Sequence, residues 1–133
     1  LCGREQVFRR KSCEVGYRHL KTTQLVKNDK ISSHLGENVY MFVWHNDEVY
    51  PDHPDLNIIA YTKDCPNHIF RYKDKCIWGI QGHPEITLKE SKNWFEENRN
   101  DLEKDGANIK DLISEASEAK PAKMMIERFA KLI

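Results

Sequence analysis

The sequence has no net charge and no long apolar run. Lysine plus arginine and aspartate plus glutamate both number 21 in 133 residues, so the formal net charge is zero. A balanced charge gives no reason to expect a nucleic-acid or membrane-surface partner. No apolar segment approaches the length of a membrane span, and the chain does not open on a signal-peptide pattern. We therefore expect a soluble protein with no nucleic-acid partner and no membrane partner.

Cysteine is sparse, and its spacing offers no disulfide framework. No two of the four cysteines form a Cys-x-x-Cys pair; they are Cys2, Cys13, Cys65 and Cys76. The simplest setting is a reducing, cytoplasmic compartment. A length of 133 residues with 39% hydrophobic residues is enough for one core but not for two. We expect residues 1–133 to form a single domain or most of one.

The most informative stretch is 76–87, which reads Cys-Ile-Trp-Gly-Ile-Gln-Gly-His-Pro-Glu-Ile-Thr. Its apolar first half is typical of a strand in the buried middle of a sheet, and Pro84 stiffens the turn that follows. A histidine becomes a useful general base when a carboxylate fixes its tautomer and stabilises the imidazolium. We therefore expect His83 to hydrogen-bond Glu85 and to face a cleft. The alternative is an ordinary turn, but packing alone accounts poorly for a His-Pro-Glu turn at this place.

This stretch resembles the His-Pro-Glu signature of the class I glutamine amidotransferases, in which a strand ends Gly-x-Gln-x-His-Pro-Glu. The resemblance implies an α/β, flavodoxin-like fold, of which this chain is the C-terminal portion, with strands followed by closing helices. It also implies that His83 and Glu85 complete a catalytic triad with a cysteine nucleophile. Within the family, the segment His-Asn-Asp-Glu-Val and the helical C-terminal residues are most similar to the glutaminase domain of GMP synthetase.

The resemblance implies a reaction as well. Glutamine would be the substrate, glutamate and ammonia the products, and a synthase domain or subunit the receiver of the ammonia, with no cofactor. Two other functions stay open. A cysteine hydrolase of γ-glutamyl bonds keeps the same triad, and a non-catalytic interaction module would lack the nucleophile.

The position of that nucleophile rests on the first residues. Leu1-Cys2-Gly3 and the segment Cys13–Tyr17 resemble the family's Leu-Gly-Gly-x-Val stretch and its Glu-x-Gly-aromatic strand, which follow the nucleophile's helix. On this alignment Cys2 occupies a glycine position and the nucleophile is expected upstream of residue 1. A second alignment sets Cys2 on the elbow pattern Cys-x-Gly-x-Gln, but Arg4 then stands where the elbow needs a glycine. We favour the first alignment.

A second segment of the resemblance is an apolar strand that begins at Asn38 and ends in polar residues before Pro51. In the family, the matching strand leads through His-x-Asp into a loop beside the glutamine site, whose backbone helps to hold the amino-acid end of the substrate. The residues expected to bind substrate are therefore Trp44, His45, Asn46 and Asp47.

A metal site is the competing interpretation of this segment. Its candidate ligands would be His45, Asp47, His53 and Asp55. Their spacing matches no metal-binding pattern and two prolines interrupt them, so a solvated loop is favoured and no metal is expected.

The remaining pattern predicts strands and then helices. Residues 17–26 are typical of a half-exposed strand, and short strands with tight turns follow from Leu56 to the signature. Thr87 and Glu90 form a capping box for a helix whose stripe reaches Leu102, and Asn108 is expected to cap a second helix. Pro121 suits the first turn of a third helix. The buried side predicted for it consists of Met125, Ile126, Phe129, Leu132 and Ile133.

Overall fold

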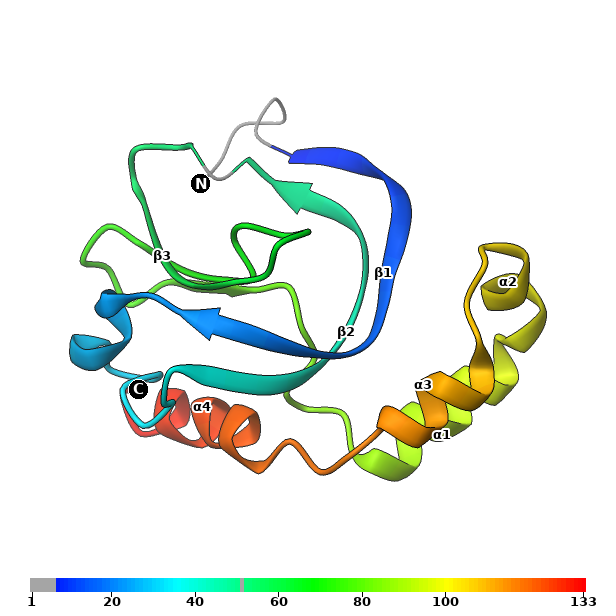
Figure 1. The fold of residues 1–133 in the computed structure, drawn as a ribbon. Coiled ribbons are helices and arrows are strands. Elements are labelled where there is room, and N and C mark those ends of the chain that lie inside the picture. Colours follow the sequence, from blue (N-terminus) through cyan, green and yellow to red (C-terminus); the bar gives the residue numbers. More distant parts are fainter. Residues whose placement is uncertain (1–6, 51) are drawn as a thin grey trace.

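Residues 7–50 and 52–133, which a computed structural model describes, form a curled antiparallel sheet and a set of helices (Figure 1). The strands are β1 (Val7–Thr22), β2 (Asn38–Val49), β3 (Leu56–Tyr61), β4 (Ile69–Tyr72) and β5 (Trp78–Ile80), in the sheet order β2-β1-β3-β4-β5. All four neighbouring pairs are antiparallel. A 3-10 helix, η2 (Gln24–Asn28), follows β1. The predicted α/β class, with strands before closing helices, is confirmed.

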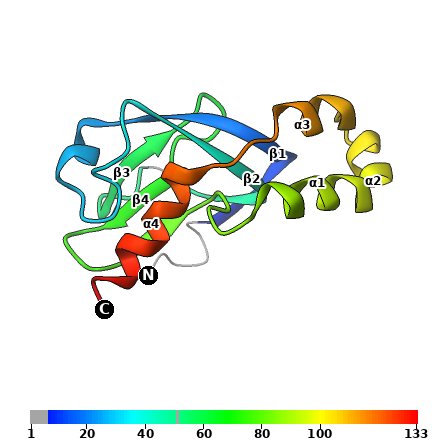
Figure 2. The ribbon, with the colours of Figure 1, turned by 90° about the horizontal axis from the view of Figure 1, so that it is seen from below.

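The helices are α1 (Leu88–Glu97), α2 (Arg99–Lys104), α3 (Ile109–Glu115) and α4 (Lys120–Ala130). Helix α4 lies across one face of the sheet, whereas α1, α2 and α3 gather at one end of it (Figures 1 and 2). None of the described helices is both long and apolar enough to cross a membrane.

Strand β2 separates two apolar cores because successive side chains of a strand point to opposite faces. Val39 and Met41 belong to the cluster that Met125 of α4 joins. Phe42, whose side chain points to the other face, belongs to the cluster that Phe95 of α1 joins. Both faces of the sheet are thus covered by helices from the C-terminal third of the chain.

The predicted helix boundaries are confirmed where a single residue sets them. Thr87 and Glu90 form the expected capping box. The Asn108 side chain accepts a hydrogen bond from the Asp111 backbone N–H at the start of α3, and Pro121 lies in the first turn of α4. The single helix predicted to reach Leu102 is wrong, because the backbone leaves helical geometry at Asn98, with φ −105° and ψ 16°, and α2 begins after it.

The buried side predicted for the last helix is only partly right. Met125 is fully buried, but most of the predicted stripe is at the surface. The exposed residues are Ile126, Phe129, Leu132 and Ile133. Helix α4 packs on the sheet through a narrow face that contains Ala122 and Met125. The adjacent face of the helix, with Ile126 and Phe129, is therefore exposed.

Two strand predictions are corrected. The strand expected over 17–26 ends at Thr22, because the Thr23 side chain accepts a hydrogen bond from the Leu25 N–H and caps η2. The strand before His83 is not in the middle of the described sheet: β5 is last in the order and half-buried. The large apolar ring of Trp78 in β5 is covered by Phe129 of α4, with 5.9 Å between the ring centroids, rather than by a second neighbouring strand.

Candidate active site

The backbone after β5 is held against β2. Gly82 forms an antiparallel bridge with Val43, and the His83 N–H donates to the Phe42 carbonyl at 2.8 Å. Two residues before His83, the Gln81 N–H donates to the His68 carbonyl at 2.8 Å. These bonds fix the chain that leads into the turn and so position the His83 side chain beyond the end of the strand.

His83 and Glu85 form the expected pair. The Nδ1 atom of His83 lies 2.8 Å from Oε1 of Glu85. A carboxylate only accepts, so Nδ1 carries the hydrogen. The Nε2 atom lies 3.3 Å from the Trp44 carbonyl oxygen, which can accept a hydrogen bond from it only when Nε2 also carries a proton. The predicted hydrogen bond is therefore confirmed, and the ring stands beside the predicted substrate-binding segment.

Aromatic side chains surround the imidazole. The His83 ring centroid is 6.0 Å from that of Phe42 and 6.4 Å from that of Trp94, which meets it nearly edge-on at 79°. Trp94 in turn packs against Trp44, with 6.1 Å between the ring centroids. Because Trp94 comes from α1, the helix that follows the signature packs directly on the site. Helical spacing placed Trp94 beside the apolar stripe of that helix but gave no sign of this contact.

The four residues of the predicted substrate-binding segment make different contacts, and all of them belong to β2 rather than to a loop. The Trp44 carbonyl faces the imidazole. The Asp47 carbonyl accepts a bond from the Gln81 side chain at 3.3 Å, while the Asp47 carboxylate pairs with Arg9 at 3.1 Å. Asn46 is half-buried. The role of this segment in holding a substrate stays a prediction.

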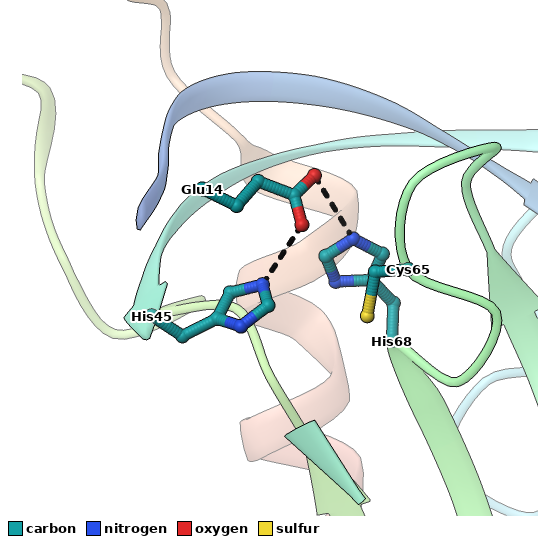
Figure 3. Close-up of side chains that lie close together, drawn as sticks. All are labelled: Glu14, His45, Cys65 and His68. Atoms are coloured by element: carbon teal, nitrogen blue, oxygen red, sulfur yellow. Dashed lines mark hydrogen bonds and ion pairs between the residues drawn. The ribbon is translucent and has the colours of Figure 1, made fainter. Parts of the chain in front are cut away.

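The His45 side chain lies in a buried cluster that the sequence did not predict (Figure 3). Its Nε2 lies 2.9 Å from Oε2 of Glu14, and Nε2 of His68 lies 3.3 Å from Oε1 of the same carboxylate. Burial raises the pKa of Glu14, but the hydrogen bonds from the two imidazoles outweigh it and hold that pKa well below its ordinary value. Cys65 completes the cluster. Four positions so far apart in sequence show no spacing pattern.

The metal ligands considered from sequence do not come together among the described residues. Asp47 pairs with Arg9, and Asp55 pairs with Lys73 at 3.0 Å. The His53 ring accepts a hydrogen bond from the Asp55 N–H. Of that set, only His45 belongs to the buried cluster.

No cysteine in the described part of the chain hydrogen-bonds to His83. Burial raises the pKa of the Cys65 thiol to about 11 and also raises that of Cys13. Cys76 is exposed. Cys2, and with it the choice between the two alignments of the first residues, lies outside the described residues.

Solved structures share this fold. A glutamine amidotransferase from Thermotoga maritima superposes with a TM-score of 0.73 at 22% identity, over 95% of this chain and 53% of that one. A second, from Methylobacillus Flagellatus, gives a TM-score of 0.71 at 19% identity, over 94% and 55% of the two chains. The chain thus spans about half the length of each. These likenesses define the class: a mixed α/β protein with the fold of the glutamine amidotransferases.

The family follows from the sequence match. The family model described as "Glutamine amidotransferase class-I" matches residues 5–101. The chain belongs to the class I glutamine amidotransferase family.

Curated relatives are similar over parts of their length. A glutamine-hydrolyzing GMP synthase from Porphyromonas gingivalis is 33% identical over 75 residues, which is 56% of this chain and 14% of that protein. One subunit of a glutamine-hydrolyzing GMP synthase from Picrophilus torridus is 30% identical over 84 residues, which is 59% of this chain and 45% of that one. The similarity to GMP synthase glutaminase domains expected from the sequence is confirmed.

Proposed function

We propose that this chain carries the acid–base half of a glutaminase site, which releases ammonia from the side-chain amide of glutamine. The observation that carries the proposal is the 2.8 Å bond between His83 and Glu85 beyond the end of β5. The side chains are 34% and 53% exposed, so a substrate and a nucleophile can approach the ring. Membership of the class I family supports the choice of substrate.

In the first half-reaction, Nε2 of His83 accepts the proton of a cysteine thiol. The sulfur attacks the side-chain amide carbon of glutamine, and the tetrahedral intermediate collapses when the imidazolium returns that proton to the leaving nitrogen. The products are ammonia and a glutamyl thioester. Glu85 keeps Nδ1 protonated, so Nε2 is the atom that exchanges the proton, and it stabilises the transient imidazolium.

In the second half-reaction, water replaces the thiol as the species that His83 deprotonates. Its oxygen attacks the thioester carbonyl, the carbon–sulfur bond breaks, and the thiolate recovers a proton while glutamate leaves. The segment Trp44, His45, Asn46 and Asp47 lies along β2 beside this position. Its backbone is proposed to hold the amino-acid end of glutamine, since the His45 side chain is turned into the buried cluster.

The attacking cysteine is proposed to be none of Cys13, Cys65 and Cys76. A nucleophilic cysteine needs thiolate character, whereas burial raises the pKa of the first two. Within the described residues, none of the three forms a hydrogen bond with His83. This leaves Cys2 or a cysteine outside this sequence, and the alignment of the first residues favours the latter.

The ammonia is proposed to pass to a synthase domain or subunit in the cytoplasm. Relatives from Picrophilus torridus and Pyrococcus abyssi are each named as one subunit of a glutamine-hydrolyzing GMP synthase. Such a name implies at least one partner subunit in those proteins, and we extend this arrangement to the present chain.

The test compares His83→Ala and Glu85→Ala with His19→Ala, an exposed histidine of β1, in the active protein. Loss of the general base should cost at least about 10²–10⁴ in kcat. Glu85→Ala should leave a measurable remainder, because orientation is partly recoverable, and His19→Ala should match wild type. Released ammonia and glutamate are the measured quantities. Wild-type turnover in His83→Ala would refute the mechanism, and faster cleavage of γ-glutamyl peptides than of glutamine would favour the hydrolase alternative.

The nucleophile is located separately with a cysteine-directed glutamine analogue and peptide mass mapping. The 133-residue chain alone should release no ammonia and take no adduct. Labelling of Cys2 together with glutamine turnover would make Cys2 the nucleophile and overturn the preferred alignment. An adduct on Cys13, Cys65 or Cys76 with turnover would contradict the proposal itself.

A further inference from the structure

The buried cluster behind the site joins three parts of the fold. Glu14 comes from β1 and His45 from β2, while Cys65 and His68 come from the connection between β3 and β4 (Figure 3). One oxygen, nitrogen or sulfur donor atom from each lies within 4.8 Å of the other three. All four side chains are buried: those of Cys65 and His68 are 0% exposed, and those of Glu14 and His45 are 5% and 8% exposed.

The donor set matches a borderline transition metal. Zinc is bound by thiolate, imidazole and carboxylate in four-coordinate tetrahedral sites, at about 2.0–2.3 Å from each ligand atom. Ligand atoms of such a tetrahedron lie roughly 3.3–3.8 Å apart. The present separation of 2.9 Å between Oε2 of Glu14 and Nε2 of His45 is already close to this range. Small side-chain adjustments would therefore admit an ion.

Hydrogen bonding alone leaves one atom of the cluster without a partner. Nε2 of His68 faces Glu14, whereas Nδ1 of His68 is buried and makes no hydrogen bond within the described part of the chain. Because Nε2 donates to the carboxylate in the neutral ring, Nδ1 bears a lone pair, which is the form that binds a metal. Binding through Nδ1 would keep the bond to Glu14, and metal-bound histidines generally donate their other N–H to such a group.

The charges around the cluster also leave room for a cation. Glu14 and Glu48 are buried carboxylates, and the guanidinium of Arg10, which is well buried, pairs with both. Arg18 lies 3.9 Å from Glu14 but is 38% exposed and thus more screened. Counted by themselves, the two carboxylates and the Arg10 guanidinium carry one excess negative charge. An entering divalent ion would offset it and displace the Cys65 thiol proton to water.

We propose that Glu14, His45, Cys65 and His68 form a binding site for a divalent transition metal, with zinc as the ion that their chemistry fits best. No sequence pattern indicated a metal here, since the set is assembled from β1, β2 and the β3–β4 connection. Its role would be structural. The His68 carbonyl accepts the N–H of Gln81, two residues before His83, so the ion would stiffen the segment that presents the proposed base.

The test uses the full chain, stripped with a chelator and titrated with zinc against a chromophoric competitor. Cys65→Ala and His68→Gln remove one ligand each, and Cys76→Ala removes an exposed cysteine as the matched control. A glutamine at 68 keeps an N–H donor for Glu14, so that variant should still fold, which a thermal melt checks. Wild type and Cys76→Ala should bind one zinc, and each ligand variant should bind at least about 100-fold more weakly.

Cobalt gives an independent measurement in the wild-type protein. A site with Cys65 bound should show thiolate-to-cobalt charge transfer and the visible bands of a tetrahedral ion. Zinc should also raise the melting temperature of wild type but not of His68→Gln. The proposal is overturned if wild type binds no zinc or shows no charge-transfer band. It is equally overturned if both ligand variants bind like wild type, or if Cys76→Ala abolishes binding, which would indicate an adventitious surface ion only.

Discussion

Gly82 packs closely against Met41 and Phe42 of β2 and directly precedes His83 in the chain. A Cβ atom at this position would lie 2.3 Å from the Met41 sulfur and 3.0 Å from the Phe42 carbonyl oxygen. Met41 is fully buried, so its side chain has little room to move aside. The Phe42 carbonyl is the acceptor for the His83 N–H and is fixed within β2. Gly82→Ala should therefore push the His83 segment away from β2.

The expected magnitude follows from these contacts. Inserting a methyl group into a packed site costs about 1–3 kcal/mol. For a domain of this size, that lowers the melting temperature by roughly 3–15 °C. Displacing a catalytic group by about 1 Å costs up to about 10² in rate. Gly82→Ala should thus lose roughly one to two orders of magnitude in glutaminase kcat. This loss is larger than the decrease in the fraction of folded protein at 25 °C would cause.

Gly36→Ala is the matched control, because a Cβ atom there has nothing within 4 Å. Neither glycine has a positive φ, so strain from a left-handed backbone does not enter the comparison. Thermal melts and steady-state ammonia release are measured for both variants in the same active protein that is used to test His83→Ala. If Gly82→Ala melts and turns over like Gly36→Ala, the contact with β2 does not position His83 and the reasoning fails.

Two further predictions concern the scaffold. Met125→Ala should destabilise the fold by about 2–5 kcal/mol, because Met125 is 0% exposed. Met124→Ala on the same helix should cost under about 0.5 kcal/mol, because Met124 is 43% exposed. Equal midpoints of urea unfolding for the two variants would show that α4 does not pack as described. The pKa of Glu14 in the folded chain lies below the ordinary 4.5, so its ionised form stabilises the fold above that pH, and the stabilisation is lost as the pH falls through the folded value. Glu14→Gln should then have a lower free energy of unfolding than wild type at pH 7, and this difference should shrink on acidification below pH 4.5. Urea unfolding at several pH values measures it, and the control Glu97→Gln, at an exposed position, should show no such difference. A difference that grows as the pH falls would contradict the assignment.

Features set by neighbouring residues were predictable from the sequence. The His83–Glu85 bond spans two residues around a proline, so the turn brings the groups together wherever the strand lies. The starts of α1 and α3 were also predictable, because Thr87 and Asn108 satisfy backbone N–H groups within three residues. In each case the donor and acceptor are so close in the chain that local geometry suffices.

Features set by packing were mispredicted. Apolar residues such as Ile126 and Phe129 fit a helical stripe, but periodicity does not reveal how wide a face the sheet will cover. In the same way, the apolar strand at Trp78 suggested a buried middle position. Its ring is instead half-covered by α4, at the last strand of the described sheet.

The sequence by itself determined the family, the catalytic pair proposed for it, and most helix starts, because these depend on short motifs. Only the tertiary structure decided that the Trp44 carbonyl faces His83, 39 positions away. Only it turned His45 toward Glu14, 31 positions away, and brought Cys65 and His68 beside them. Contacts between such distant positions arise from strand register and sheet curvature, which the pairing of whole strands sets and no local spacing encodes.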